Sequence, residues 1–206
     1  MKRKILLTLF ILSVICFLVF FSLHYKLAAS ILKTFPLIIL LLMIRLKNVY
    51  NKLIFSGFIF SLAGDIFLSQ SIKMFLPGLG CFFISQIFYI LAFVKKCKLP
   101  AYVWAVLSYL YGTVVFVLLS SYTGKLTIPV LIYIVVIATM LWRSAAGYKI
   151  SIAFRYAFYG AVFFVVSDTI IGIEQFIQPK FNTSYLSILT YWAAQFLIYR
   201  STVEKK

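Results

Sequence analysis

Apolar runs long enough to form membrane-spanning helices alternate with short polar clusters along the whole chain. A helix needs about 20 predominantly apolar residues to cross the hydrocarbon core of a bilayer. The pattern predicts an all-α integral membrane protein, with residues 1–206 forming a single transmembrane domain. The first run is preceded by a basic cluster, but at about 19 residues it exceeds a signal-peptide core, so we interpret it as a spanning helix. The eight predicted helices are 5–23, 27–44, 53–70, 74–94, 101–120, 127–142, 152–173 and 184–201.

Composition agrees with the bilayer as the solvent of this chain. Of its 206 residues, 64% are hydrophobic and the mean hydropathy is +1.07, whereas soluble domains are closer to half apolar. The net charge of +16 is divided among small clusters between the apolar runs, which argues against nucleic-acid binding. Cys16, Cys81 and Cys97 form no paired motif and His24 stands alone, so no disulfide framework or metal site is expected.

Basic residues alternate in number between successive segments that connect the predicted helices. Cytoplasmic loops of membrane proteins carry an excess of Lys and Arg. The segments between the richer ones hold one cation each, namely Lys26, Lys73, Lys125 and Lys180. We therefore expect both termini to be cytoplasmic. The richer segments hold three cations each: Lys2, Arg3, Lys4; Arg45, Lys47, Lys52; Lys95, Lys96, Lys98; Arg143, Lys149, Arg155; Arg200, Lys205, Lys206.

Two of the four acidic residues interrupt apolar runs in matching frames. Asp65 and Asp168 each follow a Gly by eight residues, a Phe by five and a small residue by one. An Asp at the centre of a bilayer costs roughly 3 kcal/mol on insertion scales, so a matched pair indicates either a functional site or a structural helix contact. Both motifs have the same orientation, which indicates a parallel repeat of four plus four helices with a site at its interface.

The predicted topology places Lys33 at the same depth as both carboxylates, roughly 8–10 Å below the outer surface at 1.5 Å per residue. Lys33 can extend to the surface, pair with a carboxylate or hold an anionic headgroup. Glu174 is expected at the outer end of its helix, in contact with water. Polar side chains expected near the two carboxylates, either in a site or as interhelical hydrogen bonders, are Ser61, Gln86, Tyr89, Tyr133, Ser167, Thr190, Tyr191 and Gln195.

Two carboxyl groups in a dry pocket suit acid–base chemistry. One group can stay protonated at neutral pH while the other is ionised, with coupled titrations. A general acid beside a base or cation stabiliser then results. The same pairing of carboxylates serves the cleavage of glycosides through an oxocarbenium-like state.

Three motifs surround the polar positions: Phe60-Ser-Leu-x-Gly-Asp65, Gly-Ala-x-Phe-x-x-x-Ser-Asp168 and Thr190-Tyr-x-x-Ala-Gln195-x-Leu-Ile-x-x-Ser201. They resemble motifs of the YhhN-like family, the lysoplasmalogenase family of multi-pass membrane proteins. Lys33 and Pro36 lie where the family has an adjacent Lys-Pro element. Ser85-Gln86-x-x-Tyr89 lies where the family has Ala-His-x-x-Tyr. Tyr133 and Met140 also resemble the family pattern, and the resemblance covers about residues 27–201.

The resemblance implies hydrolysis of the vinyl ether bond of lysoplasmalogen to a fatty aldehyde and glycerophosphoethanolamine or glycerophosphocholine. It implies no cofactor, a lysophospholipid substrate and the bilayer as the partner. Asp65 and Asp168 are then the expected catalytic residues, one as acid and one as base or cation stabiliser, in an order that the sequence leaves open. Lys33 is expected to hold the phosphate. Compact size and short loops favour a bacterial cytoplasmic membrane, and the sequence leaves the oligomeric state open.

Three alternative functions would use the same residues. A proton- or ion-coupled transporter would also use an intramembrane carboxylate pair. An intramembrane aspartyl protease is disfavoured, because Leu62 stands where its GxGD element needs Gly. An enzyme of the same fold that acts on another lysolipid is not excluded by any residue.

Overall fold

In the computed structural model, all regular structure of the described residues, 2–69, 71–180 and 183–203, is helical. Each predicted run coincides with helical structure, and the second contains two helices in place of one. Lys205 and Lys206, two of the cations expected on the cytoplasmic side, lie outside the described residues. The helices are α1 (Lys2–Ser22), α2 (Lys26–Leu32), α3 (Phe35–Met43), α4 (Val49–Phe67), α5 (Phe75–Lys96), α6 (Tyr102–Thr123), η1 (Gly124–Leu126), α7 (Thr127–Ala145), α8 (Ile152–Phe176) and α9 (Ser184–Ser201).

Pro36 accounts for the break in the second run. Proline inside a helix lacks an N–H donor, and its ring clashes with the carbonyl group four residues earlier, which here is that of Leu32. Accordingly α2 ends at Leu32, and α3 begins at Phe35 with the proline in its first turn, where the missing donor costs nothing. Lys33 and Thr34 lie in the gap, and the break sets the position of the Lys33 side chain.

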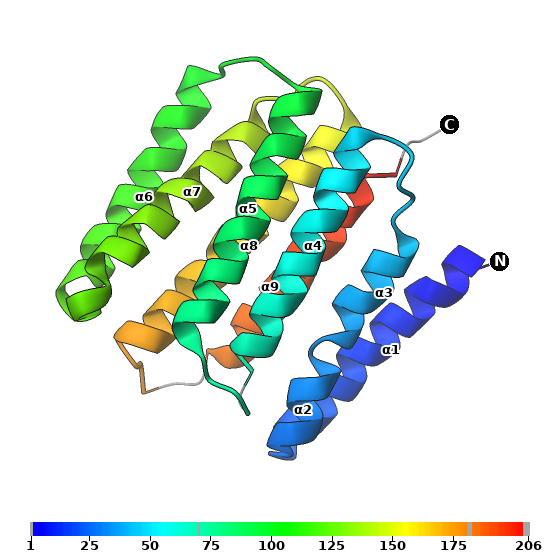
Figure 1. The fold of residues 1–206 in the computed structure, drawn as a ribbon, viewed down its shortest axis with the longest axis vertical. Helices are drawn as coiled ribbons and strands as arrows, with labels where there is room; N and C mark the ends of the chain where they lie inside the picture. The colour runs from blue at the N-terminus through cyan, green and yellow to red at the C-terminus, as the bar shows by residue number, and fades with distance from the viewer. Residues whose placement is uncertain (1, 70, 181–182, 204–206) are drawn as a thin grey trace.

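Figure 1 shows α4, α5, α8 and α9 in the middle of the bundle, with α1–α3 on one side and the α6–α7 hairpin on the other. The most extensive helix contacts are those of α4 with α5 and of α8 with α9. The start of α1 and the end of α9 lie toward one end of the bundle, and the ends of α1, α4, α6 and α8 lie toward the other. Consecutive long helices of the bundle thus run in opposite directions.

Glycines permit the close contact within the two central helix pairs. A Cβ atom added at Gly57 of α4 would lie 2.3 Å from the ring of Tyr89 in α5. At Gly160 of α8 it would lie 3.0 Å from the carbonyl oxygen of Ala194 and from the amide nitrogen of Ile198 in α9. Small residues at helix interfaces let backbones approach in this way.

Five helical stretches among the described residues are long and apolar enough to cross a membrane: Arg3–Ser22, Lys26–Met43, Phe75–Lys96, Tyr102–Ala145 and Ile152–Phe176. Large apolar side chains are exposed along α1, α6 and α7, as expected of a surface that faces lipid. The chain is therefore a multi-pass membrane protein. The helices α4 and α9 do not reach the same hydropathy, because they carry polar residues that the bundle buries.

Candidate active site

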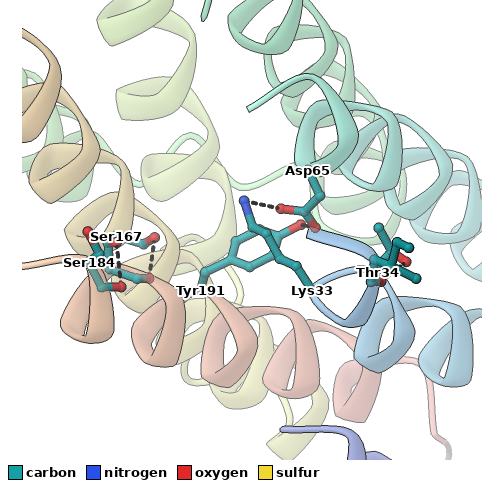
Figure 2. A network of polar contacts seen from close by, with 8 residues as sticks. Lys33, Thr34, Asp65, Ser167, Ser184 and Tyr191 are labelled. Atoms are coloured by element: carbon teal, nitrogen blue, oxygen red, sulfur yellow. Dashed lines mark hydrogen bonds and ion pairs between the residues drawn. The ribbon is translucent and has the colours of Figure 1, made fainter. Parts of the chain in front are cut away.

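Asp65 lies in the last turn of α4 and is 1% exposed. The ammonium nitrogen of Lys33 is 3.2 Å from its Oδ1 atom, and the hydroxyl group of Tyr191 donates to Oδ2 at 2.7 Å. Figure 2 shows these side chains converging from the α2–α3 break, α4 and α9. Of the positions open to Lys33 from its sequence, the structure has the one beside a carboxylate.

A cavity of about 250 Å³ opens beside this group. Asp65, Lys33 and Tyr191 line it together with side chains from α1, α2, α4, α5, α8 and α9. Its remaining wall combines hydroxyl, amide and carboxyl groups with aromatic and aliphatic side chains. We call it the polar cavity, and its other lining residues are Phe17, Phe21, Ala29, Ser30, Leu68, Ser69, Phe75, Phe82, Ser167, Ile171, Glu174, Gln175, Ser184, Ser187 and Ile188.

Asp168 of α8 has a different set of partners. The hydroxyl group of Tyr133 in α7 donates to its Oδ2 atom. Gln86 of α5 donates from Nε2 to the same oxygen at 3.3 Å and to the Tyr133 hydroxyl group at 2.7 Å. Two neutral groups thus hold this carboxyl group, whereas a cation and a hydroxyl group hold Asp65.

A second cavity of about 60 Å³ contains Asp168 and is almost wholly apolar; we call it the apolar cavity. It lies among α5, α6, α7 and α8. Four residues line both cavities and separate them: Leu68, Phe75, Phe82 and Ile171. The two carboxylates therefore face different spaces with a common wall. The other residues of the apolar cavity are Leu79, Tyr111, Gly112, Val115, Leu119, Val130, Tyr133, Ile134, Ile137, Ala138, Val165, Thr169, Gly172 and Phe176.

An aromatic cluster around Phe164 packs against Phe82, one of the residues that line both cavities. The fully buried ring of Phe164 lies edge-on to three other rings, with centroids 5.8 Å from Tyr191, 6.1 Å from Phe82 and 6.2 Å from Tyr89. Such edge-to-face contacts are favourable beyond their apolar burial. The cluster fixes the orientation of Tyr191, which in turn orients Asp65.

A buried hydrogen-bond network connects α4, α5 and α9. The hydroxyl group of Ser61 lies 2.7 Å from that of Ser85 and 3.2 Å from that of Tyr89. Tyr89 donates to Oε1 of Gln195 at 3.0 Å. Ser61, Tyr89, Gln86 and Gln195, all expected near the carboxylates, line neither cavity. Gln86 nevertheless contacts Asp168, whereas the other three support the helices that carry the site.

Ser167 and Thr190 differ in their relation to the site. Ser167 lines the polar cavity and donates to the carbonyl oxygen of Ser187 at 2.8 Å. Thr190 donates to carbonyl groups of its own helix and lines neither cavity. The sequence places Thr190 at the depth of the two carboxylates. Adjacent residues of a helix point in different directions, however, so Tyr191 faces the polar cavity and Thr190 does not.

Glu174, expected to be in contact with water, lines the polar cavity and accepts a hydrogen bond from Thr183, the residue before α9. Its spacing would have revealed this position. Ser167, Ile171 and Glu174 are separated by four and three residues, so they share one face of α8, and all three line the polar cavity.

The two carboxylates have equivalent partners in the two halves of the chain. Asp65 pairs with Lys33 from the apolar run before its own and with Tyr191 from α9. Asp168 pairs with Tyr133 from the apolar run before its own and with Gln86 from α5. Each carboxylate thus takes one partner from its own half of the chain and one from the fourth apolar run of the other half.

Comparison with known proteins identifies related sequences but no related structure. The model of the YhhN family matches residues 27–202. Human lysoplasmalogenase TMEM86A is 34% identical over 159 residues, which cover 74% of this chain and 66% of the relative; its counterpart from Bos taurus gives the same values. Human lysoplasmalogenase TMEM86B is 27% identical over 149 residues, covering 72% of this chain and 62% of the relative. The matches thus span slightly less than two thirds of these relatives, and no solved structure matches significantly.

Proposed function

The chain belongs to the YhhN family, and from this premise we propose that it is a lysoplasmalogenase that hydrolyses the vinyl ether bond of its substrate within the membrane. The products are a fatty aldehyde and a glycerophospho-ethanolamine or -choline. The relatives that carry the name lysoplasmalogenase support this activity. They give no support to a transporter.

One structural observation carries the proposal for this chain: a polar cavity and an apolar cavity share a wall, and the buried Asp65 lines the first while the half-buried Asp168 lines the second. A lysophospholipid has the same division, with a polar headgroup, a single apolar chain and the vinyl ether between them. The headgroup occupies the polar cavity, and the first methylene groups of the chain lie against the apolar one. The vinyl ether then lies at the common wall, between Asp65 and Asp168.

The reaction needs one proton donor and one proton acceptor. A carboxylic acid protonates the vinyl ether at carbon, and the positive charge that forms is shared with the ether oxygen. The other carboxyl group, ionised, stabilises this oxocarbenium ion and takes a proton from the water that attacks it. The resulting hemiacetal breaks down to the aldehyde and the free alcohol. Asp65 and Asp168 provide these two groups, and Lys33 holds the phosphate.

We further propose that the chain forms a single domain of eight spanning helices, related as four plus four. Both termini face the cytoplasm. The matched motifs, the equivalent partners of Asp65 and Asp168, and the distribution of cations support this arrangement. Compact size and short connections favour a bacterial cytoplasmic membrane as its location.

The deciding experiment is aldehyde release from a lysoplasmalogen by the purified protein in detergent. The wild type should release aldehyde, and Asp65→Asn and Asp168→Asn should each abolish release while remaining folded. An acyl lysophospholipid of equal chain length serves as the substrate control and should yield no aldehyde. Absence of aldehyde from well-folded wild-type protein would refute the proposal.

A further inference from the structure

Glu174 lies in the polar cavity at a distance from the catalytic group. Tyr191, which bonds to Asp65, and Thr183, which bonds to Glu174, are eight residues apart at the start of α9. At 1.5 Å per residue their positions differ by about 12 Å along the helix. The polar cavity therefore extends from the buried Lys33–Asp65 pair to a carboxylate near the helix ends.

We propose that Glu174 binds the cationic amine of a zwitterionic phospholipid headgroup and so makes the protein selective for ethanolamine and choline headgroups. This inference rests on the proposed function, since it assumes that the polar cavity takes the headgroup of the substrate. It assigns to Glu174 a role in specificity, separate from the acid–base step.

The length of the headgroup fits the offset of about 12 Å along α9 between Tyr191 and Thr183, the hydrogen-bond partners of the two carboxylates. Nine covalent bonds connect the ether oxygen of a glycerophosphoethanolamine lipid to its amine nitrogen. At about 1.2 Å of advance per bond, an extended chain spans about 11 Å. With the vinyl ether beside Asp65, the amine thus reaches the level of Glu174, and the phosphate lies between them, within reach of the long side chain of Lys33.

The charges are arranged in the same order as those of the ligand. The charged residues that line the polar cavity are Lys33 and Asp65 at the inner end and Glu174 at the outer end. An ammonium group has three donors, so the contact of Lys33 with Asp65 leaves others for a phosphate oxygen. A carboxylate accepts at both oxygens, and among the described residues Thr183 bonds to Oε1 of Glu174. An anionic headgroup without an amine would bring no cation to Glu174, and such a mismatch lowers affinity.

The first experiment measures binding without catalysis. Two saturated ether lysolipids of equal chain length, one with a phosphoethanolamine and one with a phosphoglycerol headgroup, are titrated onto the purified protein. The wild type should prefer phosphoethanolamine by roughly tenfold in Kd. Glu174→Gln should reduce this preference to near one, and Glu174→Lys should reverse it. An unchanged preference in Glu174→Gln would overturn the proposal.

Thr183→Val is the matched control. It removes the hydrogen bond that connects α8 to the start of α9 but leaves the Glu174 carboxylate in place, so the preference should persist. If Thr183→Val lost the preference as fully as Glu174→Gln, the contact would be structural and the proposal wrong. The saturated ethers are not hydrolysed, so the binding test does not depend on the reaction. A wild type that binds them selectively but releases no aldehyde from a lysoplasmalogen would refute the proposed reaction and leave the amine site supported.

Discussion

The ammonium nitrogen of Lys33 lies 3.2 Å from Oδ1 of Asp65, at the point where Pro36 interrupts the second apolar run. Lys33 is 16% exposed, whereas Asp65 is 1% exposed. A half-buried cation therefore pairs with a fully buried carboxylate. Removing one partner of such a pair leaves an uncompensated charge, which costs more than the pair contributes.

Lys33→Met should consequently destabilise the protein by about 3 kcal/mol and abolish aldehyde release. The double variant Lys33→Met/Asp65→Asn should recover most of the stability, because no unpaired charge remains, but no activity. Thermal unfolding in detergent and an aldehyde assay check both statements. Equal destabilisation in the single and double variants would show that Lys33 acts through packing alone.

Tyr133→Phe removes the hydroxyl group that donates to Asp168 and keeps the ring in place. We expect kcat to fall by roughly 10- to 100-fold with little change in KM, since Tyr133 orients a reacting group. Tyr109→Phe is the matched control: its hydroxyl group lies 2.8 Å from that of Thr139 in α7, neither residue lines a cavity, and its loss should leave kcat unchanged. Steady-state kinetics on one lysoplasmalogen distinguishes these outcomes.

Gly160→Ala should loosen the contact between α8 and α9. The added Cβ atom would lie 3.0 Å from backbone atoms of Ala194 and Ile198, which cannot rotate away as a side chain can, so we expect a loss of about 1–3 kcal/mol. Gly80→Ala meets nothing within 4 Å in α5 and should be neutral or stabilising by up to about 1 kcal/mol. Unfolding of both variants in the same detergent measures the difference.

Much of the helix arrangement follows from the sequence, because apolar run length and cation spacing are set by the bilayer itself. The YhhN resemblance is confirmed by the family match. The helical rise per residue alone predicts that Lys33 lies at the same membrane depth as Asp65, and in the structure their side chains form an ion pair. The hydropathy pattern did not reveal the helix break at Lys33, since a proline in the first turn of a new helix and a proline inside a helix have the same apolar surroundings.

The division of the site into two cavities could not be predicted in the same way. It depends on where the rings of Phe82 and Phe164 pack, and these are two among the 22 phenylalanines of the chain. Helical spacing assigns Phe164 to the same face as Asp168 but does not reveal that its ring contacts Tyr191 in α9. Glu174 was missed for another reason: its place near a helix end suggested contact with water, although its spacing from Ser167 pointed to the cavity.

The proposed topology has a direct test in cysteine labelling. In a variant without the native cysteines, Lys125→Cys should react with a membrane-impermeant maleimide added outside intact cells. Lys98→Cys should react only after the membrane is opened, because it lies in a connection of the opposite set. Labelling of both positions from outside would contradict the eight-helix arrangement with cytoplasmic termini.

Ala138→Leu should lower the activity on long-chain lysoplasmalogens more than the activity on short-chain ones. Ala138 lines the apolar cavity from α7 and is 2% exposed, so a larger side chain there fills space of which only about 60 Å³ is open. If the first methylene groups of the alkenyl chain lie against this cavity, kcat/KM for a long-chain lysoplasmalogen should fall by roughly tenfold, since each buried methylene contributes about 0.8 kcal/mol. A substrate whose alkenyl chain ends close to the vinyl ether should be affected much less, because it has few methylene groups to lose. An equal loss for both substrates would mean that the substitution disturbs Asp168 rather than the chain, and the chain would then have to lie elsewhere, along the lipid-facing side of α1.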